Sequence, residues 1–466
     1  MKWLSIIICW MAPCWAWAAE DDSNGRPPNI ILILADDLGW TDVISNGAGF
    51  DQTPHLEKLA ADGMTFTSAY AGGANCQPSR ACLLSGQYTP RHGVYAVGRT
   101  DRGPKQLQRL VAVPNRDGLA PEVFTIAEAL RAAGYRTAIS GKWHLDGREG
   151  APPDRQGFDE VFQASNEWTK SDPADPKGVF SLTRSACEFI ELHKERPFFL
   201  YLPHYAVHGP HQACTATLAE VRSEKREKRD PLYAACIRDM DESIGTLMRK
   251  LAELQLERNT MVVFTSDNGA TTISPQEPLR GNKGCYYEGG IRVPMIVRWP
   301  GMIKAGSRCD SPVTQIDFYP TFLAAAGVSP RGGTPLDGES LLPLLQGGAD
   351  LKRPAICWHF PGYLDTPVIR GRDPVFRTRP VSVIRKGNWK LHLFHEEWLL
   401  DGGRDKLDTN CAVELYHLSE DIGERHDLSM ESRAKRDELL NDLLQWLKSI
   451  SAPMSSIPPD QRKNPK

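Results

Sequence analysis

Several short segments of the chain are almost entirely apolar, and each runs directly into charged or polar residues. The clearest is NIILILADD at residues 29–37, and PFFLYL at 197–202 and MVVFT at 261–265 have the same character. An uninterrupted apolar run of this length is typical of a strand that is buried on both faces. We therefore expect these segments to be strands of a mostly parallel sheet.

The segments between these strands have the pattern of helices. TIAE at residues 125–128 is a capping box, and the helix that it opens should end near Gly134. Apolar residues at helical spacing predict a second helix: Ile237, Ile244, Leu247, Leu251 and Leu254. Further strands are expected for YRTAIS at 135–140 and VPMIVRW at 293–299. The alternation predicts an α/β domain over residues 28–353, with helices on both faces of the sheet.

Polar side chains follow the expected strands at the point where each one ends. In an open α/β sheet the carboxyl ends of the parallel strands lie at one edge, and ligands bind there. The residues concerned are of metal-binding or cationic type: Asp36, Asp37, Lys142, His144, His204, His208, Asp267 and Asn268. We expect these side chains to form a single site.

Two of these pairs offer oxygen atoms that favour a hard divalent cation. Asp36 and Asp37 follow one strand, and Asp267 and Asn268 follow another. Such oxygens suit Ca²⁺ or Mg²⁺ better than Zn²⁺, and a divalent cation relieves the repulsion within a carboxylate cluster. Either pair alone could equally be a polar turn. A metal that faces Lys and His side chains suits a tetrahedral oxyanion, so both sulfate and phosphate esters fit such a site.

The character of the sequence changes after about residue 354. VSVIRKGNWKLHLF and AVELYHLSED predict antiparallel strands, and ESRAKRDELLNDLLQWLKSI predicts an amphipathic helix. Residues 354–450 are therefore expected to form a smaller α+β subdomain. The proline-containing tail at 451–466 is expected to be disordered.

The first residues have the features of a secretory signal peptide. Lys2 is followed by the apolar stretch WLSIIICWM and then by AWA at residues 16–18, an A-x-A cleavage site. Removal of residues 1–18 predicts an exported protein, periplasmic or extracellular. The apolar stretch is too short to span a membrane, and no later stretch is a candidate transmembrane segment. The net charge of −3 excludes a global field that would recruit nucleic acid.

Nine cysteines remain once Cys9 and Cys14 leave with the signal peptide. Eight of them could pair in an oxidising compartment, and the absence of a C-x-x-C pair argues against a thiolate zinc site. Cys76 lies just before Pro78, which fits the first turn of a helix, and a helix N-terminus stabilises an anion. From the residues alone, Cys76 can be a nucleophile with a lowered pKa, half of a disulfide or a packed structural cysteine.

The segment CQPSRACLLSGQYTPRHGV at 76–94 closely resembles the signature of the type I sulfatases, C-x-P-S-R followed by an apolar run and a glycine. Further blocks resemble the family in the family's order: NIILILADDLGW, GKWHL, TSDNG, LRGNKGCYYEGGIRVP, IDFYPTFLAAAG and ELYHLSEDIGERHDL. The resemblance covers roughly residues 28–428. It implies an alkaline phosphatase-like fold and sulfatase activity. It also implies that a formylglycine-generating enzyme oxidises Cys76 to Cα-formylglycine (3-oxoalanine), whose hydrated aldehyde is the family's nucleophile.

The resemblance assigns the metal and the groups around the nucleophile. The implied ligands of one Ca²⁺ are Asp36, Asp37, Asp267, Asn268 and an oxygen of the modified Cys76. Arg80 matches the residue that holds the formylglycine hydrate on its metal side. Lys142 and His144 match the pair that flanks the hydroxyl groups of the hydrate.

The resemblance also implies how protons move. Lys283 and His208 match the residues that bind the sulfate and help the leaving oxygen depart. Asp267 is expected to accept a proton from the attacking hydroxyl. His144 is expected to remove the proton of the second hydroxyl when sulfate is released.

Other functions remain open at this point. A phosphodiesterase or phosphonate monoester hydrolase shares the nucleophile motif, and a catalytically silent protein that binds sulfated glycans would share the fold. Residues 100–121 and 360–380 match no family block and are expected to line the substrate entrance. Export and the aromatic segments SNEWTK at 165–170 and CWHFPGY at 357–363 favour a carbohydrate sulfate as substrate, although the same aromatic residues could simply pack in the core.

Overall fold

The predicted sheet lies at the centre of the larger part of the molecule. The computed structural model describes residues 26–43, 53–163, 172–224, 230–348 and 350–459, so the expected signal peptide and the segment 165–170 lie outside the described residues. Eight strands pair in the order β5-β4-β6-β1-β7-β8-β2-β9. Their bounds are β1 Asn29–Ala35, β2 Met64–Phe66, β4 Arg136–Ser140, β5 Glu160–Phe162, β6 Phe198–Pro203, β7 Thr260–Ser266, β8 Met295–Arg298 and β9 Ser307–Cys309. Only β8 runs antiparallel to its neighbours, which confirms the mostly parallel sheet.

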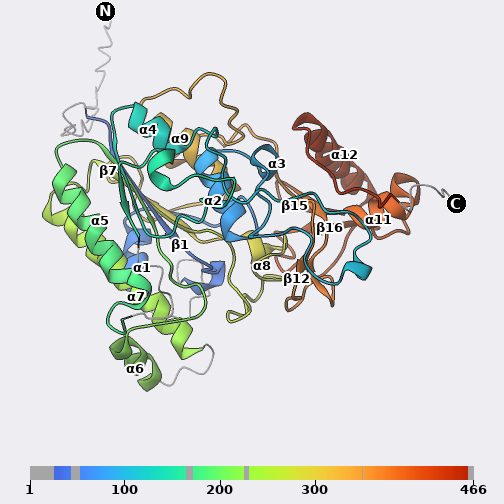
Figure 1. Cartoon of the computed structure of the whole chain (residues 1–466), viewed down its shortest axis with the longest axis horizontal. Coiled ribbons are helices and arrows are strands. Elements are labelled where there is room, and N and C mark those ends of the chain that lie inside the picture. Colours follow the sequence, from blue (N-terminus) through green and yellow to red (C-terminus); the bar gives the residue numbers. More distant parts are fainter. Residues whose placement is uncertain (1–25, 44–52, 164–171, 225–229, 349, 460–466) are drawn as a thin grey trace, which may run out of the picture.

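Helices cover both faces of this sheet (Figure 1). Strand β1 is buried throughout, and its alternate residues contact different layers: Ile30 packs with α2, α4 and α9, whereas Ile31 packs with α1, α5 and α7. The helices are α1 Pro54–Ala61, α2 Cys76–Ser85, α3 Thr89–His92, α4 Ile126–Ala132, α5 Val179–His193, α6 Thr215–Ser223, α7 Pro231–Glu253, α8 Glu288–Ile291, α9 Phe318–Ala325, α10 Leu342–Leu345, α11 His395–Leu400 and α12 Arg433–Ser449. Thr125 caps α4 in the predicted capping box. Among the described residues, no helix has both the length and the apolarity needed to cross a bilayer.

The C-terminal region forms a second, antiparallel sheet in the order β11-β14-β15-β16. Helix α12 covers it through Leu439, Leu440, Leu443 and Leu447 (Figure 1). The strands are β11 Ile356–Phe360, β14 Val381–Lys386, β15 Trp389–Phe394 and β16 Val413–His417. Two small sheets pair β3 Ala69–Tyr70 with β10 Val313–Thr314, and β12 Leu364–Asp365 with β13 Phe376–Thr378.

A buried network of charges joins the two parts of the molecule. The Lys390 ammonium on β15 lies 2.9 Å from a carboxylate oxygen of Glu288 on α8 and 2.9 Å from one of Glu424. Glu288 also pairs with Arg292 at 2.8 Å and accepts a hydrogen bond from the Tyr70 hydroxyl at 2.7 Å. All of these side chains are buried, so the network fixes α8 against the C-terminal sheet.

The structure corrects the expectation for the tail and bears on the pairing of the cysteines. Residues 451–459 are described, and Ser456 pairs through its backbone with Val111, at 2.8 and 3.1 Å, so disorder from residue 451 is wrong for this stretch. The sequence left open whether eight of the cysteines pair, and no disulfide is present among the described residues, where all nine cysteines are free and most are buried. Buried apolar surroundings explain why these cysteines need no partner, since an unoxidised cysteine behaves as a small apolar residue.

The aromatic segment at 357–363 packs inward. Trp358 is buried, donates from its indole nitrogen to the Ala71 carbonyl at 2.9 Å and contacts Tyr70 edge to face. Tyr363 is buried as well. These rings cannot stack on a bound sugar, so this segment no longer supports a carbohydrate substrate.

Candidate active site

The two acidic pairs meet because their strands are neighbours. β1 and β7 pair in parallel with Ala35 opposite Ser266, so the residues that follow each strand emerge side by side. Carboxylate oxygens of Asp36, Asp37 and Asp267 all lie within 4.8 Å of one another. The Asn268 amide donates to Asp37 Oδ1 at 2.7 Å, and the Asp37 N–H donates to Asp267 Oδ1 at 3.2 Å. The sheet therefore assembles a buried cluster of oxygen atoms.

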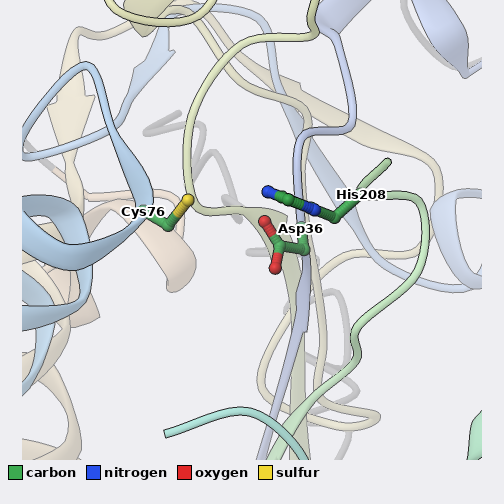
Figure 2. A group of neighbouring side chains, drawn as sticks. All are labelled: Asp36, Cys76 and His208. Atoms are coloured by element: carbon green, nitrogen blue, oxygen red, sulfur yellow. The ribbon is translucent and has the colours of Figure 1, made fainter. Parts of the chain in front are cut away.

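Cys76 opens helix α2 and faces this cluster. It is the first residue of the helix and only 1% exposed. Figure 2 shows its sulfur, the Asp36 carboxylate and the His208 ring converging on one space, and their ligand atoms lie within 4.8 Å of one another. The Lys283 ammonium lies 3.1 Å from the sulfur. The predicted nucleophile position and the predicted metal ligands therefore share one site.

Three buried cations surround the acidic cluster. The Arg80 guanidinium donates twice to Asp267 Oδ2, at 3.0 and 2.8 Å, and once to the Lys142 carbonyl at 2.8 Å. The Lys142 ammonium donates to Asp36 Oδ2. Lys283 lies 2.6 and 2.8 Å from the two oxygens of Asp37. Each carboxylate of the cluster thus has a cationic partner.

The surroundings of these groups shift their pKa values in different directions. Burial acts to raise the pKa of Asp36, but the charges of Lys142 and Arg80 lower it overall, so Asp36 stays ionised. Burial and the nearby Asp36 charge raise the pKa of Asp267 to about 6, against the opposing charge of Arg80. The rise reflects the crowding of buried carboxylates, which a bound divalent cation would relieve.

The unmodified thiol of Cys76 is a poor nucleophile. Burial raises its pKa to about 11, although Lys142 and Lys283 act in the opposite direction. At neutral pH the group is a thiol, whereas a cysteine nucleophile needs the thiolate. Of the interpretations left open by the sequence, the raised pKa argues against a thiol nucleophile, and Cys76 forms no disulfide among the described residues.

The three predicted histidines occupy different environments. His144 is neutral, because burial and the nearby Lys142 lower its pKa to about 3. Burial also lowers the pKa of His208, whose side chain is 30% exposed and whose Nε2 lies 3.7 Å from Asp37 Oδ2. His204 is buried toward α7, with Nε2 3.4 Å from the Ser243 hydroxyl. Within the described structure, His204 has no contact with the cluster, so its inclusion in a single site is wrong.

Two of the predicted ligands carry oxygen atoms suited to a cation. Asp36 Oδ1 and Asn268 Oδ1 are buried, and neither has a hydrogen-bond partner among the described residues. A buried acceptor without a partner is costly, and a divalent cation would satisfy both oxygens. Hard oxygen donors with two or more carboxylates are the ligands that Ca²⁺ prefers, so the residues present fit this ion.

Gln315 is a supporting residue that sequence reasoning missed. Its side chain donates to the Ser266 carbonyl at the end of β7, at 2.6 Å, and accepts from the Ser79 hydroxyl of α2 at 2.5 Å. It thereby ties the helix that carries Cys76 to the strand that carries Asp267. The only signal in the sequence is its position directly before the block IDFYPTFLAAAG, and that position does not indicate a contact.

Comparison with known proteins agrees with this arrangement. A family model described as Sulfatase matches residues 28–328, and one described as N-sulphoglucosamine sulphohydrolase, C-terminal, matches residues 281–452. The N-acetylgalactosamine-6-sulfatase of Mus musculus is 32% identical, over 89% of this chain and 84% of its own length. Arylsulfatase A of Homo sapiens is 33% identical, over 91% and 88%.

A solved structure has the same fold. Ps i-CgsB in complex with k-i-k-neocarrahexaose superposes with a TM-score of 0.72 and 28% identity, covering 91% of this chain and 92% of that one. The matches extend through both the catalytic part and the C-terminal sheet, and the signature cysteine lies among acidic and basic partners. By sequence and by fold, the chain belongs to the sulfatase family of sulfuric ester hydrolases.

Proposed function

We propose that this protein is an exported sulfatase that hydrolyses sulfate esters of carbohydrates with a formylglycine derived from Cys76 and one bound Ca²⁺. One observation carries the proposal: Cys76 Sγ shares a buried space with the carboxylate cluster and lies 3.1 Å from the Lys283 ammonium. This is the arrangement that a reaction at an anionic sulfate ester requires, because the group must be held beside the nucleophile and against positive charge.

The residues of the site fit both the Ca²⁺ and the formylglycine hydrate. Asp36, Asp37, Asp267 and Asn268 would hold the Ca²⁺, and the orphaned oxygens of Asp36 and Asn268 support this assignment. A formylglycine hydrate would supply the attacking hydroxyl, and the cation would withdraw charge from the sulfate oxygens.

The charges of the site suit an anionic substrate. The three carboxylates are matched by three cations, Arg80, Lys142 and Lys283. A divalent cation would add two positive charges to this neutral set. The single negative charge of a sulfate ester would offset one of them, and the released sulfate dianion would offset both. Lys283 is positioned to bind a sulfate oxygen, because its ammonium lies between Asp37 and the Cys76 side chain.

Proton transfer can be assigned to particular atoms. Asp267 Oδ2 accepts two hydrogen bonds from Arg80, and its Oδ1 accepts one from the Asp37 N–H, so the carboxylate is held in one orientation within the cluster. We assign to it the proton of the attacking hydroxyl. The His208 side chain is 30% exposed, whereas Asp267 is fully buried, and this exposure suits a donor to the leaving oxygen. His144 is neutral and therefore able to accept a proton, and a bound anion would raise its low pKa.

The substrate and the destination of the protein rest on other observations. Relatives at about one-third identity include an N-acetylgalactosamine-6-sulfatase, which supports a sugar sulfate as substrate. Residues 1–18 support export, and the test is whether the mature protein begins at Ala19.

Two measurements test the proposed activity. Mass spectrometry of the tryptic peptide that contains Cys76 should show the aldehyde in place of the thiol. The same preparation should release sulfate from at least one sugar in a panel of sulfated monosaccharides and oligosaccharides, and should cleave 4-nitrophenyl sulfate faster than an aryl phosphonate. Faster phosphonate cleavage would favour the phosphonate hydrolase alternative. An unmodified Cys76 in the native host, with binding of sulfated sugars but no turnover, would favour the silent binding protein.

A further inference from the structure

The two segments that match no family block lie side by side in the fold. The Tyr363 N–H donates to the Thr100 carbonyl at 2.6 Å, and the Arg102 N–H donates back to the Tyr363 carbonyl at 3.2 Å. The second segment then continues through β12 and β13, and Thr378 on β13 donates to the Gly284 carbonyl at 2.9 Å. These segments therefore reach the residue that follows Lys283.

Arg377 contacts the active-site lysine, Lys283, directly. Its Nε donates to the Thr366 carbonyl at 3.1 Å, and its Nη1 donates to the Lys283 carbonyl at 3.3 Å. The side chain of Lys283 points the other way, with its ammonium 3.1 Å from Cys76 Sγ. A single residue, Lys283, thus contacts both the Arg377 guanidinium and the nucleophile position.

The charge of Arg377 has no carboxylate partner within the described part of the chain, and its Nη2 donates no hydrogen bond there. Its neighbours on the chain differ in this respect. Arg372 pairs with Glu397 at 2.9 Å and with Glu414 at 3.2 Å. Arg379 pairs with Asp373 at 2.5 Å and with Glu396 at 2.8 Å. Arg377 is therefore the member of this basic group that keeps donors available for a ligand.

A second guanidinium lies in the same electrostatic environment. Burial and the charge of Arg102 lower the pKa of Arg377, whereas Asp365 and the active-site Asp37 act in the opposite direction. Arg102 Nε lies 3.5 Å from Asp365 Oδ1, so this carboxylate is paired with Arg102 and not with Arg377. A surplus of positive charge remains beside the site, and a guanidinium binds carboxylate or sulfate oxygens through two parallel hydrogen bonds.

We propose that Arg377, assisted by Arg102, binds a second anionic group of the substrate, a carboxylate or a further sulfate on the sugar that bears the cleaved sulfate or on its neighbour. This inference rests on the proposed function and narrows its substrate to a polyanionic glycan. It assigns part of the specificity to the two segments in which this chain departs from the family blocks.

The test compares three probes with increasing charge. The probes are N-acetylgalactosamine 6-sulfate, the same sugar with a second sulfate, and the same sugar linked to glucuronic acid. We expect Arg377→Gln to lower kcat/KM on one or both of the doubly charged probes by about 10- to 100-fold more than on the monosulfated sugar, mainly through KM, because a charge-assisted hydrogen bond is lost. Loss confined to the second sulfate or to the glucuronate would identify which anion the subsite takes. Arg377→Lys, which keeps the charge, should recover part of the loss.

Arg379→Gln is the matched control, because this arginine lies on the same segment but its charge is already paired. It should affect all three probes equally. Equal losses on all probes for Arg377→Gln, or no loss on any, would overturn the subsite. If the wild type with modified Cys76 releases sulfate from no probe and from no aryl sulfate, the proposed function fails. In that case the subsite is tested by binding alone. The dissociation constant of the disulfated sugar is measured for Cys76→Ser and for the double variant Cys76→Ser, Arg377→Gln. We expect weaker binding by the double variant, and equal dissociation constants would overturn the subsite.

Discussion

Replacing Lys390 by methionine should destabilise the protein strongly and in a pH-dependent way. The ammonium is fully buried and lies 2.9 Å from oxygens of both Glu288 and Glu424. Glu288 keeps Arg292 as a partner after the substitution, whereas Glu424 loses its cation. Removing one member of a buried ion pair costs about 3–5 kcal/mol, because the other charge stays buried without compensation. We expect a loss of this size in the free energy of unfolding at pH 8.

The sign of the pH dependence follows from Glu424. Burial raises the pKa of its carboxyl from 4.5 to about 7 in the folded protein, even though Lys390 opposes the rise. A carboxyl with a raised pKa holds its proton more tightly in the folded state, so stability falls as pH rises from 4.5 to about 7. Without Lys390 the pKa of Glu424 in the folded protein rises further. Each additional pKa unit lowers the free energy of unfolding by about 1.4 kcal/mol once the pH is above that pKa. The destabilisation by Lys390→Met should therefore be much smaller at pH 5 than at pH 8.

Urea unfolding followed by tryptophan fluorescence at the two pH values measures this difference. The second substitution Glu424→Gln removes the unpaired charge and should restore part of the stability at pH 8. Lys386→Met is the control, because Lys386 pairs with Glu438 and Asp442 on the surface, and its loss should cost about 1 kcal/mol or less at either pH. Equal losses at pH 5 and pH 8 for Lys390→Met, or no recovery in the double variant, would refute the reasoning.

Four further outcomes follow from the site. Cys76→Ala should abolish sulfate release yet cost only about 1 kcal/mol of stability, and retained activity would refute the nucleophile assignment. Asp36→Ala should lower the calcium content and the rate together, as measured by elemental analysis and sulfate release, and a fully active metal-free enzyme would refute the calcium site. His208→Ala should slow hydrolysis of a sugar sulfate by about 100-fold or more but affect 4-nitrophenyl sulfate far less, because an activated leaving group needs little acid assistance, whereas equal losses would count against this role. Gly141→Ala should destabilise the protein by about 2–5 kcal/mol in urea unfolding, because its φ is 132° and an added Cβ would lie 2.0 Å from the Pro203 carbonyl oxygen, and an unchanged midpoint would contradict that geometry.

The central strands and the acidic cluster could be predicted from the sequence because both depend on local patterns. β1 and β7 are apolar throughout, and once they are neighbours in a parallel sheet, Asp36 and Asp267 must emerge together. The direction of a side chain within a loop has no such local signal. His204 and His208 both follow β6, yet His204 turns toward α7 and only His208 reaches the cluster.

Contacts between residues far apart in the sequence were the least predictable part. Gln315 bonds to Ser79, and Arg377 bonds to Lys283, but nothing in the spacing of these residues indicates the pairing. The segment containing Trp358 was ambiguous for a related reason, because an aromatic residue has the same local pattern whether it packs in a core or faces a ligand.

The burial of helix α2 limits when Cys76 can be modified. All ten residues from Cys76 to Ser85 are buried, so the C-x-P-S-R motif is inaccessible to any other protein once the chain has folded. Under the proposed function, an enzyme that oxidises Cys76 would therefore have to act before this segment folds. A molecule that folded first would then remain intact but unmodified and inactive. The specific activity of a preparation would then depend on the rate of oxidation relative to the rate of folding in the producing cell. Growth at a lower temperature, where folding is slower, should therefore raise the specific activity.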